Sequence, residues 1–318
     1  MTTPTCPYAG GMTVPDETER AALVALLRTR PDGLRWPEIV AEVAETGSSR
    51  EVWRRHVADT LPGTSGAGDP LGSAARDLAA WAAAGHQVVT VLDPDYPERL
   101  RGIHQAPPVL FARGALIPRD RAVSVVGSRT ASRRGVDIAA NIARALVSEG
   151  ITVVSGLAHG VDAAAHRAAL DAGGRTVAVI GTGINRVYPE ANRALHSEIA
   201  ERGLLLSQFW PDAPPQRHTF LTRNATMSGY GIATVVVEAQ EKSGARVQAR
   251  VAVEHGRPVV LTDVVVGDNE WARQLVGRPG VHVAVGLDDV LAVVCRLRDE
   301  EQAVADALDR LTSAHPVG

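Results

Sequence analysis

The amino-acid sequence predicts an α/β fold in which a parallel sheet is covered by helices on both faces and is preceded by a small helical region. From residue 122 onward, short apolar runs recur, among them AVSVVG, ITVVSG and RTVAVIG. A helical pattern separates each run from the next. The runs are mainly apolar and β-branched and do not alternate regularly with polar residues, which is typical of strands buried on both faces.

The elements in front of the core are helical and lead into a turn-rich linker. Asp16 and Glu19 form a capping-box-like helix start, and Gly33 ends that segment. The linker, LPGTSGAGDPLGS, is rich in glycine. The sequence therefore predicts helices at 16–33, 36–46 and 49–60, the linker at 61–73, a helix at 73–85 and a strand at 87–92.

The composition favours a soluble cytoplasmic protein. The chain has 318 residues, 45% of them hydrophobic, with a net charge of −3 and a pI of about 6.4, which excludes a globally basic nucleic-acid coat. Lys242 is the only lysine, so any phosphate site would use arginines and backbone amides. Cys6 and Cys295 fit no metal spacing and suggest a reducing compartment. No apolar run approaches the roughly 20 residues of a membrane helix, so no membrane association is expected.

Glycine, serine and arginine gather where the first core strand ends. The loop GSRTASRRG contains Gly127, Ser128 and Arg129. The carboxyl ends of parallel strands meet at one edge of a sheet, where ligands bind, and free amides at a helix start attract anions. The stretch 119–134 has five arginines against one aspartate. We therefore expect this loop to bind an anion, with an ordinary solvated loop as the alternative.

The next two core strands also end in small residues, in the segments SGLAHG and GTG. Three such turns at one edge favour a ligand that carries phosphate. The sequence has neither the GxGxxG fingerprint nor a Walker lysine, so dinucleotide or P-loop binding is not expected. The candidate residues are Ser155, Gly156, His159 and Gly160 in the second loop and Gly181, Thr182 and Gly183 in the third.

His159, Asp162 and His166 have a spacing that could serve a metal ion. His159 precedes the predicted helix, however, and residues 163–165 are alanines, which is typical of close packing between a helix and a sheet. We therefore expect no metal at this motif. Asp162 is expected to cap or brace the turn, His166 to be a packed or hydrogen-bonded core residue, and His159 to face the ligand.

The segment after the fourth core strand, residues 214–231, mixes arginines with an aromatic ring. Guanidinium groups suit phosphates and a ring suits a base, so this composition favours a nucleic-acid strand. An ordinary connecting loop is the alternative. The residues expected on a loop at the same sheet edge are Arg217, His218, Phe220, Arg223 and Asn224.

One acidic and one basic residue follow the fifth core strand. Lys242 lies at another small, basic helix start. Glu238 is a lone carboxylate, which is more typical of a structural or ribose-hydroxyl partner than of an acid–base catalyst. No triad, dyad or metal cluster stands out in the sequence. We therefore expect a binding protein instead of an enzyme, and no cofactor.

Successive segments resemble the motifs of the DNA-processing protein A (DprA/Smf) family. They include VVGSRTASRRG, VVSGLAHGVDAAAH, AVIGTGINRVYPEAN and TRNATMSG, and the resemblance covers about 85–285 in order and spacing. It implies an extended Rossmann-like core, related to the lysine-decarboxylase-like nucleotide-binding folds, and a homodimer. It also implies a basic pocket for single-stranded DNA and the loading of RecA recombinase during natural transformation.

Three positions depart from the family pattern. His159 stands where the family usually has arginine, Ala225 stands where a further arginine is common, and 264–280 only loosely matches a glycine-rich segment. Fewer permanent charges imply weaker and more salt-sensitive DNA binding, or a changed ligand. The residues that match the family's binding loops are Ser128, Arg129, Ser155, Gly156, Gly160, Gly181, Thr182, Gly183, Arg223 and Asn224.

The sequence therefore predicts a single-stranded-DNA-binding protein that protects incoming DNA and loads RecA. A nucleotide sensor or a nucleoside-monophosphate glycosidic-bond hydrolase on the related fold is one alternative, although the PGGxGTxxE motif of such hydrolases is absent. A protein-interaction module is another. The apolar stretches IATVVVEA and RPVVLT favour a homodimer built around 232–262. The predicted divisions are a helical region with linker at 1–72, the Rossmann-like core at 73–295 and a short acidic tail without a winged helix at 296–318.

Overall fold

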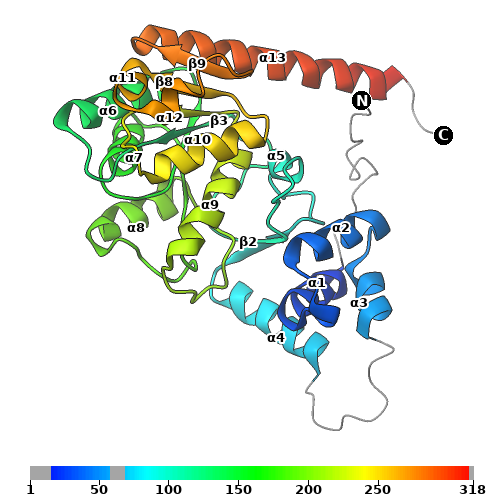
Figure 1. Ribbon diagram of the computed structural model, residues 1–318. Helices are drawn as coiled ribbons and strands as arrows, with labels where there is room; N and C mark the ends of the chain where they lie inside the picture. Colours follow the sequence, from blue (N-terminus) through cyan, green and yellow to red (C-terminus); the bar gives the residue numbers. More distant parts are fainter. Residues whose placement is uncertain (1–15, 58–68, 315–318) are drawn as a thin grey trace.

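One mixed sheet forms the core of the protein (Figure 1). The computed structural model describes residues 16–57 and 69–314. Within these ranges nine strands have the order β1-β2-β6-β5-β4-β3-β7-β8-β9. The strands from β6 to β9 in this order pair in parallel, whereas β1 and β2 pair antiparallel at one end. Their bounds are β1 (Gln87–Thr90), β2 (Val109–Gly114), β3 (Ala122–Val126), β4 (Thr152–Ser155), β5 (Thr176–Val179), β6 (Leu204–Ser207), β7 (Ala233–Val236), β8 (Val259–Thr262) and β9 (Val281–Ala284).

The order in which successive strands are added to the sheet reverses at β3. Strands β4, β5 and β6 follow one another on one side of β3, and β7, β8 and β9 follow on the other side. In open α/β sheets, ligands bind beyond the carboxyl ends of the strands at such a reversal. A ligand site is therefore expected at the loops after β3, β4, β5 and β7.

Helices cover both faces of the sheet, as the sequence predicted. Val123 and Val125 of β3 pack in a cluster with Ile142, whereas Ala122 packs on the other face in a cluster with Met227. The helices are α1 (Glu17–Thr29), η1 (Pro31–Gly33), α2 (Trp36–Thr46), α3 (Ser49–Val57), α4 (Pro70–Ala83), α5 (Glu98–Arg101), α6 (Arg133–Ser148), α7 (Val161–Asp171), η2 (Glu190–Asn192), α8 (Arg193–Arg202), α9 (Arg217–Tyr230), α10 (Gly244–Glu254), α11 (Asp263–Asp268), α12 (Glu270–Arg273) and α13 (Leu287–Ala314).

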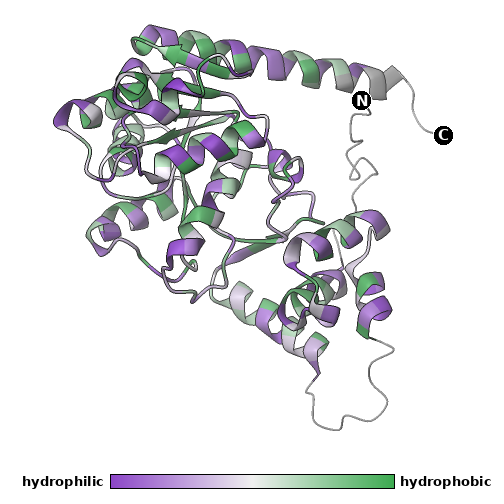
Figure 2. Cartoon of the chain, in the orientation of Figure 1, coloured by the Kyte–Doolittle hydropathy of each residue, from purple (hydrophilic) through white to green (hydrophobic). Residues whose placement is uncertain are grey.

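The distribution of apolar residues explains this layering. In Figure 2 the central strands are mainly hydrophobic, and the helices around them carry both hydrophobic and hydrophilic residues. Strands β3, β4, β5, β6, β7 and β8 are buried at every position. Among the described residues, no helix is long and apolar enough to span a bilayer.

The predicted division borders fall inside helices. Helix α4 begins at Pro70, and its N-cap Asp69 accepts the backbone N–H of Gly72, so a border at 72/73 divides that helix. Helix α13 begins at Leu287, so the predicted tail starts within it. The predicted helices at 36–46 and 49–60 correspond to α2 and α3, with residues 58–60 outside the described ranges. Residues 1–15, including Cys6, also lie outside them.

An aromatic cluster joins the N-terminal helices to the sheet. The ring of Trp81 in α4 lies 4.9 Å from Phe111 of β2 and 5.7 Å from Trp210, and Trp36 of α2 lies 5.8 Å from Trp210. The guanidinium of Arg28 in α1 lies 5.4 Å from the Trp81 ring and 5.1 Å from the Trp210 ring, a cation–π arrangement. Helices α1, α2 and α4 therefore share contacts with the core.

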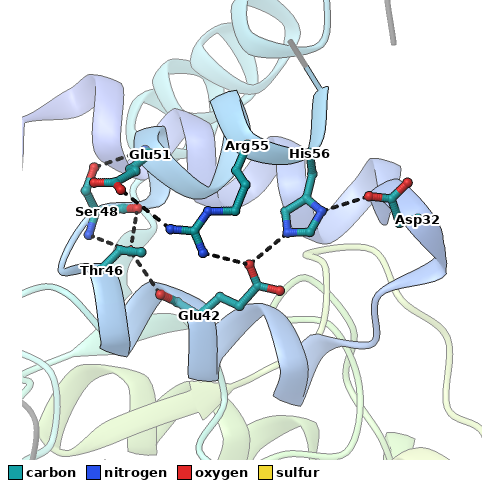
Figure 3. A network of polar contacts seen from close by, with 7 residues as sticks. All are labelled: Asp32, Glu42, Thr46, Ser48, Glu51, Arg55 and His56. Atoms are coloured by element: carbon teal, nitrogen blue, oxygen red, sulfur yellow. Dashed lines mark hydrogen bonds and ion pairs between the residues drawn. The ribbon is translucent and has the colours of Figure 1, made fainter. Parts of the chain in front are cut away.

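A network of polar side chains connects α2 and α3 within the N-terminal helices (Figure 3). The His56 ring lies between two carboxylates, with Nδ1 2.8 Å from Asp32 Oδ2 and Nε2 2.7 Å from Glu42 Oε2. Arg55 pairs with Glu51 and more loosely with Glu42. The hydrogen bonds to Asp32 and then to Glu42 raise the pKa of His56 above its usual value.

Candidate functional site

The loops at the carboxyl ends of β3, β4 and β7 are joined by backbone hydrogen bonds. The carbonyl of Ser128, after β3, accepts the N–H of Val161 at the start of α7. The N–H of Ser128 donates to the carbonyl of Glu238, after β7. These contacts bring the glycine-rich loops after β3 and β4 to one edge, together with the segment after β7.

Buried side chains hold the loop between β4 and α7. Leu157 and Gly160 have positive φ values of 57° and 72°, and a Cβ on Gly160 would overlap the carbonyl of Ser128. Asp162 Oδ2 accepts the N–H groups of Gly156 at 3.2 Å and Ala158 at 3.3 Å. The predicted role of Asp162 as a brace of the turn is therefore confirmed, and these two amides are not open to a ligand in this structure.

Asn192, in η2, binds the same loop from the other side. Its Nδ2 group donates to the carbonyl of Leu157 at 3.0 Å and to that of Ala158 at 3.2 Å. The Asp162 carboxyl is buried, and this burial raises its pKa, while the nearby Arg223 charge acts in the opposite direction. Sequence reasoning did not single out Asn192, although it lies in the motif that resembles the family.

The segment expected to be a loop after β6 is largely a helix. Helix α9 begins at Arg217, so the prediction of a loop over 214–231 was wrong for most of its length. The helix was hard to see in the sequence because its buried positions include Thr219, Arg223 and Asn224, which leave no apolar stripe. Arg217 and His218, in its first turn, are exposed.

Arg223 lies inside the protein and not on an exposed loop. It is 5% exposed, and its Nη1 donates to the carbonyl of Val179 at the end of β5. Burial lowers the pKa of its guanidinium, an effect that the Asp162 carboxylate opposes. Asn224 is buried to the same degree. The structure therefore assigns Arg223 a bracing role, and its expected contact with phosphate stays a prediction.

His159 and His166 have different environments. His166 Nδ1 lies 2.6 Å from Thr176 Oγ1, whose own hydrogen bond goes to the carbonyl of Val153. His166 is thus the hydrogen-bonded core residue that was expected, and burial lowers its pKa to about 3. His159 is exposed on the loop. Within residues 16–57 and 69–314, no group of three or more His, Cys, Asp or Glu side chains is placed to hold a metal ion.

Protein groups, and not open space, fill the gaps beside the predicted glycines. The ring of Phe220 lies where a Cβ on Gly181 would project. The carbonyl of Trp210 lies where a Cβ on Gly183 would project. Thr219 Oγ1 donates to the carbonyl of Gly181 at 2.6 Å. Like Gly181 and Gly183, Thr182 is buried. The third loop is therefore a close-packed support for α9 in this structure.

The start of α6 is occupied by a protein carboxylate. Glu238 accepts hydrogen bonds from the backbone N–H of Ser132 at 2.9 Å and from its hydroxyl at 2.5 Å. The hydroxyl of Ser132 in turn accepts the N–H of Gly135, in the first turn of α6. Glu238 therefore takes up one backbone donor at this helix start, and the expected binding of an anion by this loop stays a prediction.

The exposed groups at this edge are two rings and several basic side chains. The guanidinium carbon of Arg129 lies 5.4 Å from the ring centroid of Phe220. The ring centroid of Tyr188 also lies 5.4 Å from that of Phe220. Arg129, Tyr188 and Lys242 are exposed, and Phe220 is half-buried. Tyr188 was missed, although an aromatic residue so close to the GTG loop was a usable signal.

Comparison with known proteins places the chain in a family. The family model for DNA recombination-mediator protein A matches residues 87–291, which include every core strand and the loops described above. The chain belongs to this family. The resemblance seen in the sequence is therefore confirmed.

Several DNA recombination-mediator protein A relatives are similar over much of the chain. A Mycobacterium tuberculosis protein described as a DNA processing protein DprA is 33% identical over 94% of this chain and 82% of its own length. Protein Smf of Synechocystis is 43% identical over 54% of this chain, a match that spans only 45% of that protein. The crystal structure of DNA processing protein A from Streptococcus pneumoniae is 30% identical, with a TM-score of 0.67 over 88% of this chain and 98% of that one.

Proposed function

We propose that this protein binds single-stranded DNA at the carboxyl edge of β3, β4 and β5. The observation that carries the proposal is the group formed by the exposed Arg129 and Tyr188 and the half-buried Phe220, in which a guanidinium and two rings lie together. A guanidinium binds phosphate without regard to sequence, and rings stack on unpaired bases. We include the exposed His159 and Lys242, which follow β4 and β7, in the proposed surface.

The relatives support the same conclusion. The family is described by recombination mediation, and proteins of Bacillus subtilis and Streptococcus pneumoniae that resemble this chain are called DNA processing proteins. A DNA processing protein A of Helicobacter pylori, whose fold matches with a TM-score of 0.59, has a described single-stranded DNA binding mode. By extension, we propose that the protein acts in the cytoplasm, where it would protect incoming single strands and deliver them to RecA recombinase during DNA uptake.

Binding without catalysis fits the side chains at this edge. Glu238, the one carboxylate that sequence reasoning considered for catalysis, is held by Ser132 at the start of α6. The proposed function therefore needs neither a catalytic group nor a cofactor. The alternative of a glycosidic-bond hydrolase would need a carboxylate that is free to approach a sugar.

A homodimer is part of the proposal, with its interface at the β9 end of the sheet. The apolar stretches that suggested a dimer around 232–262 are buried inside the sheet, because β7 and β8 are covered on both faces and β9 pairs beyond them. Strand β9 is the last strand; Val283 within it is 42% exposed, and Val285 just after it is 75% exposed. Exposed apolar side chains at a sheet end are typical of contact surfaces.

The test is a comparison of ligands at fixed salt. Fluorescence anisotropy would measure the affinity of the full chain for a labelled 20-nucleotide oligo(dT), for a duplex of the same length and for a labelled mononucleotide. The proposal expects the single strand to bind most tightly, with an affinity that falls steeply as salt rises. Tightest binding of the mononucleotide would contradict it and favour the nucleotide sensor.

A further inference from the structure

Tyr188 differs from the other tyrosines that the structure describes. Tyr96 and Tyr230 are almost fully buried, and their hydroxyls donate to the carbonyl of Pro107 and to the carboxylate of Asp120. The side chain of Tyr188 is 42% exposed. Core packing does not account for a large ring that is exposed at a sheet edge, and exposed rings are typical of surfaces that contact a ligand or partner.

Phe220 supports the Tyr188 ring. The two centroids are 5.4 Å apart, and the planes are tilted by 41°. The Phe220 ring is itself fixed, because it fills the space beside Gly181, while its neighbour Thr219 donates to the carbonyl of Gly181. One side of the Tyr188 ring therefore has a firm support, and the ring is not a loose surface group.

The loop that carries Tyr188 is also held in place. The hydroxyl of Thr182 donates to the carbonyl of Arg186 at 3.1 Å, and the N–H of Arg186 donates to the carbonyl of Gly183. On the other side, Asn192 donates to the carbonyl of Leu157. The segment that carries the ring is thus fixed on both sides of Tyr188, so that a ligand would meet a surface that is already formed.

A positive charge lies beside these rings, because the guanidinium of Arg129 lies over Phe220. Arg186, two residues before Tyr188, is exposed, and its Nε donates to the carbonyl of Asp212 at 3.2 Å. Arg193 follows at the start of α8, where it pairs with Glu190. A guanidinium group beside an exposed ring matches the alternation of phosphate and base in an unpaired strand.

We propose that Tyr188 is a base-stacking residue: one unpaired base of the bound strand stacks on the exposed part of its ring, while neighbouring phosphates contact Arg129 and Arg186. This inference rests on the proposed function and names the side chain that recognises bases. Every base has a flat face, so stacking tolerates any sequence. In a duplex both faces of each base are covered by neighbouring bases, so Tyr188 would select single strands over duplexes.

The experiment separates bases from phosphates. The affinities of the wild-type chain, Tyr188→Ala and Tyr188→Phe would be measured for oligo(dT) and for an abasic strand with the same number of phosphates. The wild-type chain is expected to bind oligo(dT) about 5- to 150-fold more tightly than the abasic strand, the range that one stacked base supplies. Tyr188→Ala is expected to lose most of this preference, with its abasic affinity unchanged, and Tyr188→Phe is expected to keep it.

Each outcome decides a different point. If the wild-type chain binds oligo(dT) and Tyr188→Ala binds it equally tightly, the stacking role is wrong although the proposed function stands. Equal wild-type affinity for both strands would also overturn it, because binding would then depend on phosphates alone. If neither strand binds, the proposed function fails and this inference fails with it. Thermal unfolding of the three proteins would check that the exposed position tolerates each change.

Discussion

The guanidinium of Arg223 fills the space beside Gly156, so that a Cβ on residue 156 would overlap Nη1. This contact joins helix α9 to the loop after β4. The same guanidinium donates to the carbonyl of Val179, at the end of β5. A buried arginine thus bridges two of the loops at the candidate site, and it sets their positions without being exposed itself.

Gly156→Ala should therefore destabilise the protein and disturb the site. The added methyl group must displace Arg223, and overpacking of this kind costs about 1–3 kcal/mol of unfolding free energy. Urea unfolding would measure the loss. Gly267→Ala is a matched control, because a Cβ on Gly267 meets nothing within 4 Å. If the two variants lose the same stability, the contact between Arg223 and Gly156 is not what restricts residue 156.

His166 should make the protein less stable in acid. Its pKa is about 3 in the folded state because burial disfavours the charged ring, whereas the unfolded chain has a value near 6.5. Below about pH 6.5 the unfolded state takes up the proton first, so the free energy of unfolding falls by up to about 1.4 kcal/mol per pH unit. His166→Gln should flatten this dependence between pH 6.5 and 4. Unfolding curves of both proteins across that range measure it, and an unchanged slope in the variant would refute the assignment.

His56 should have the opposite effect. Its pKa is raised in the folded state by Asp32 and Glu42, so the folded protein holds the proton to higher pH than the unfolded chain does. This stabilisation is fully present below the unfolded pKa of about 6.5 and is lost as pH rises through the folded pKa. The difference in Tm between wild type and His56→Gln should therefore shrink from pH 6 to pH 9. A difference that stays constant over this interval would show that His56 is not protonated between the two carboxylates.

The proposed dimer interface can be tested at Val285. This side chain is 75% exposed, so Val285→Asp should leave the fold of each chain intact while it places a charge in an apolar contact. Light scattering at tens of micromolar should give a dimer mass for the wild type and a monomer mass for the variant. Val304→Asp, at another exposed apolar position, is the control and should remain dimeric. A monomeric wild-type chain would contradict the dimer altogether.

The sequence predicted the layered core because its signals are local. Strands β3 to β5 are runs of mainly apolar and β-branched residues. The alanines after Asp162 indicate a helix that packs closely on the sheet. Helix α9 was not predicted from the sequence, because the sheet edge that it covers has carbonyl groups that need polar partners. Thr219 and Arg223 are buried there to satisfy carbonyls of the β5 region, which removes the apolar periodicity on which sequence reasoning relies.

The site was predicted in position more accurately than in chemistry. The loops containing Gly156 and Gly181 do meet at one edge, because parallel strands bring their carboxyl ends together. A glycine indicates that something approaches closely, but not what approaches. Here the neighbours are Arg223 and Phe220, which are distant in sequence. Arg129 is exposed and Arg223 is buried because of their tertiary contacts. The sequence around each arginine does not predict this difference in exposure.

The most direct test of the account compares two arginines at opposite ends of one strand. Arg129 follows β3 at the candidate site, and Arg119 precedes it at the opposite sheet edge; both are exposed. Oligo(dT) affinity would be measured for Arg129→Ala and Arg119→Ala over a salt series. Arg129→Ala should bind more weakly and lower the slope of log affinity against log salt by about 0.7, the share of one phosphate contact with a single strand, whereas Arg119→Ala should match the wild type. Equal slopes for Arg129→Ala and the wild type would contradict the proposed site.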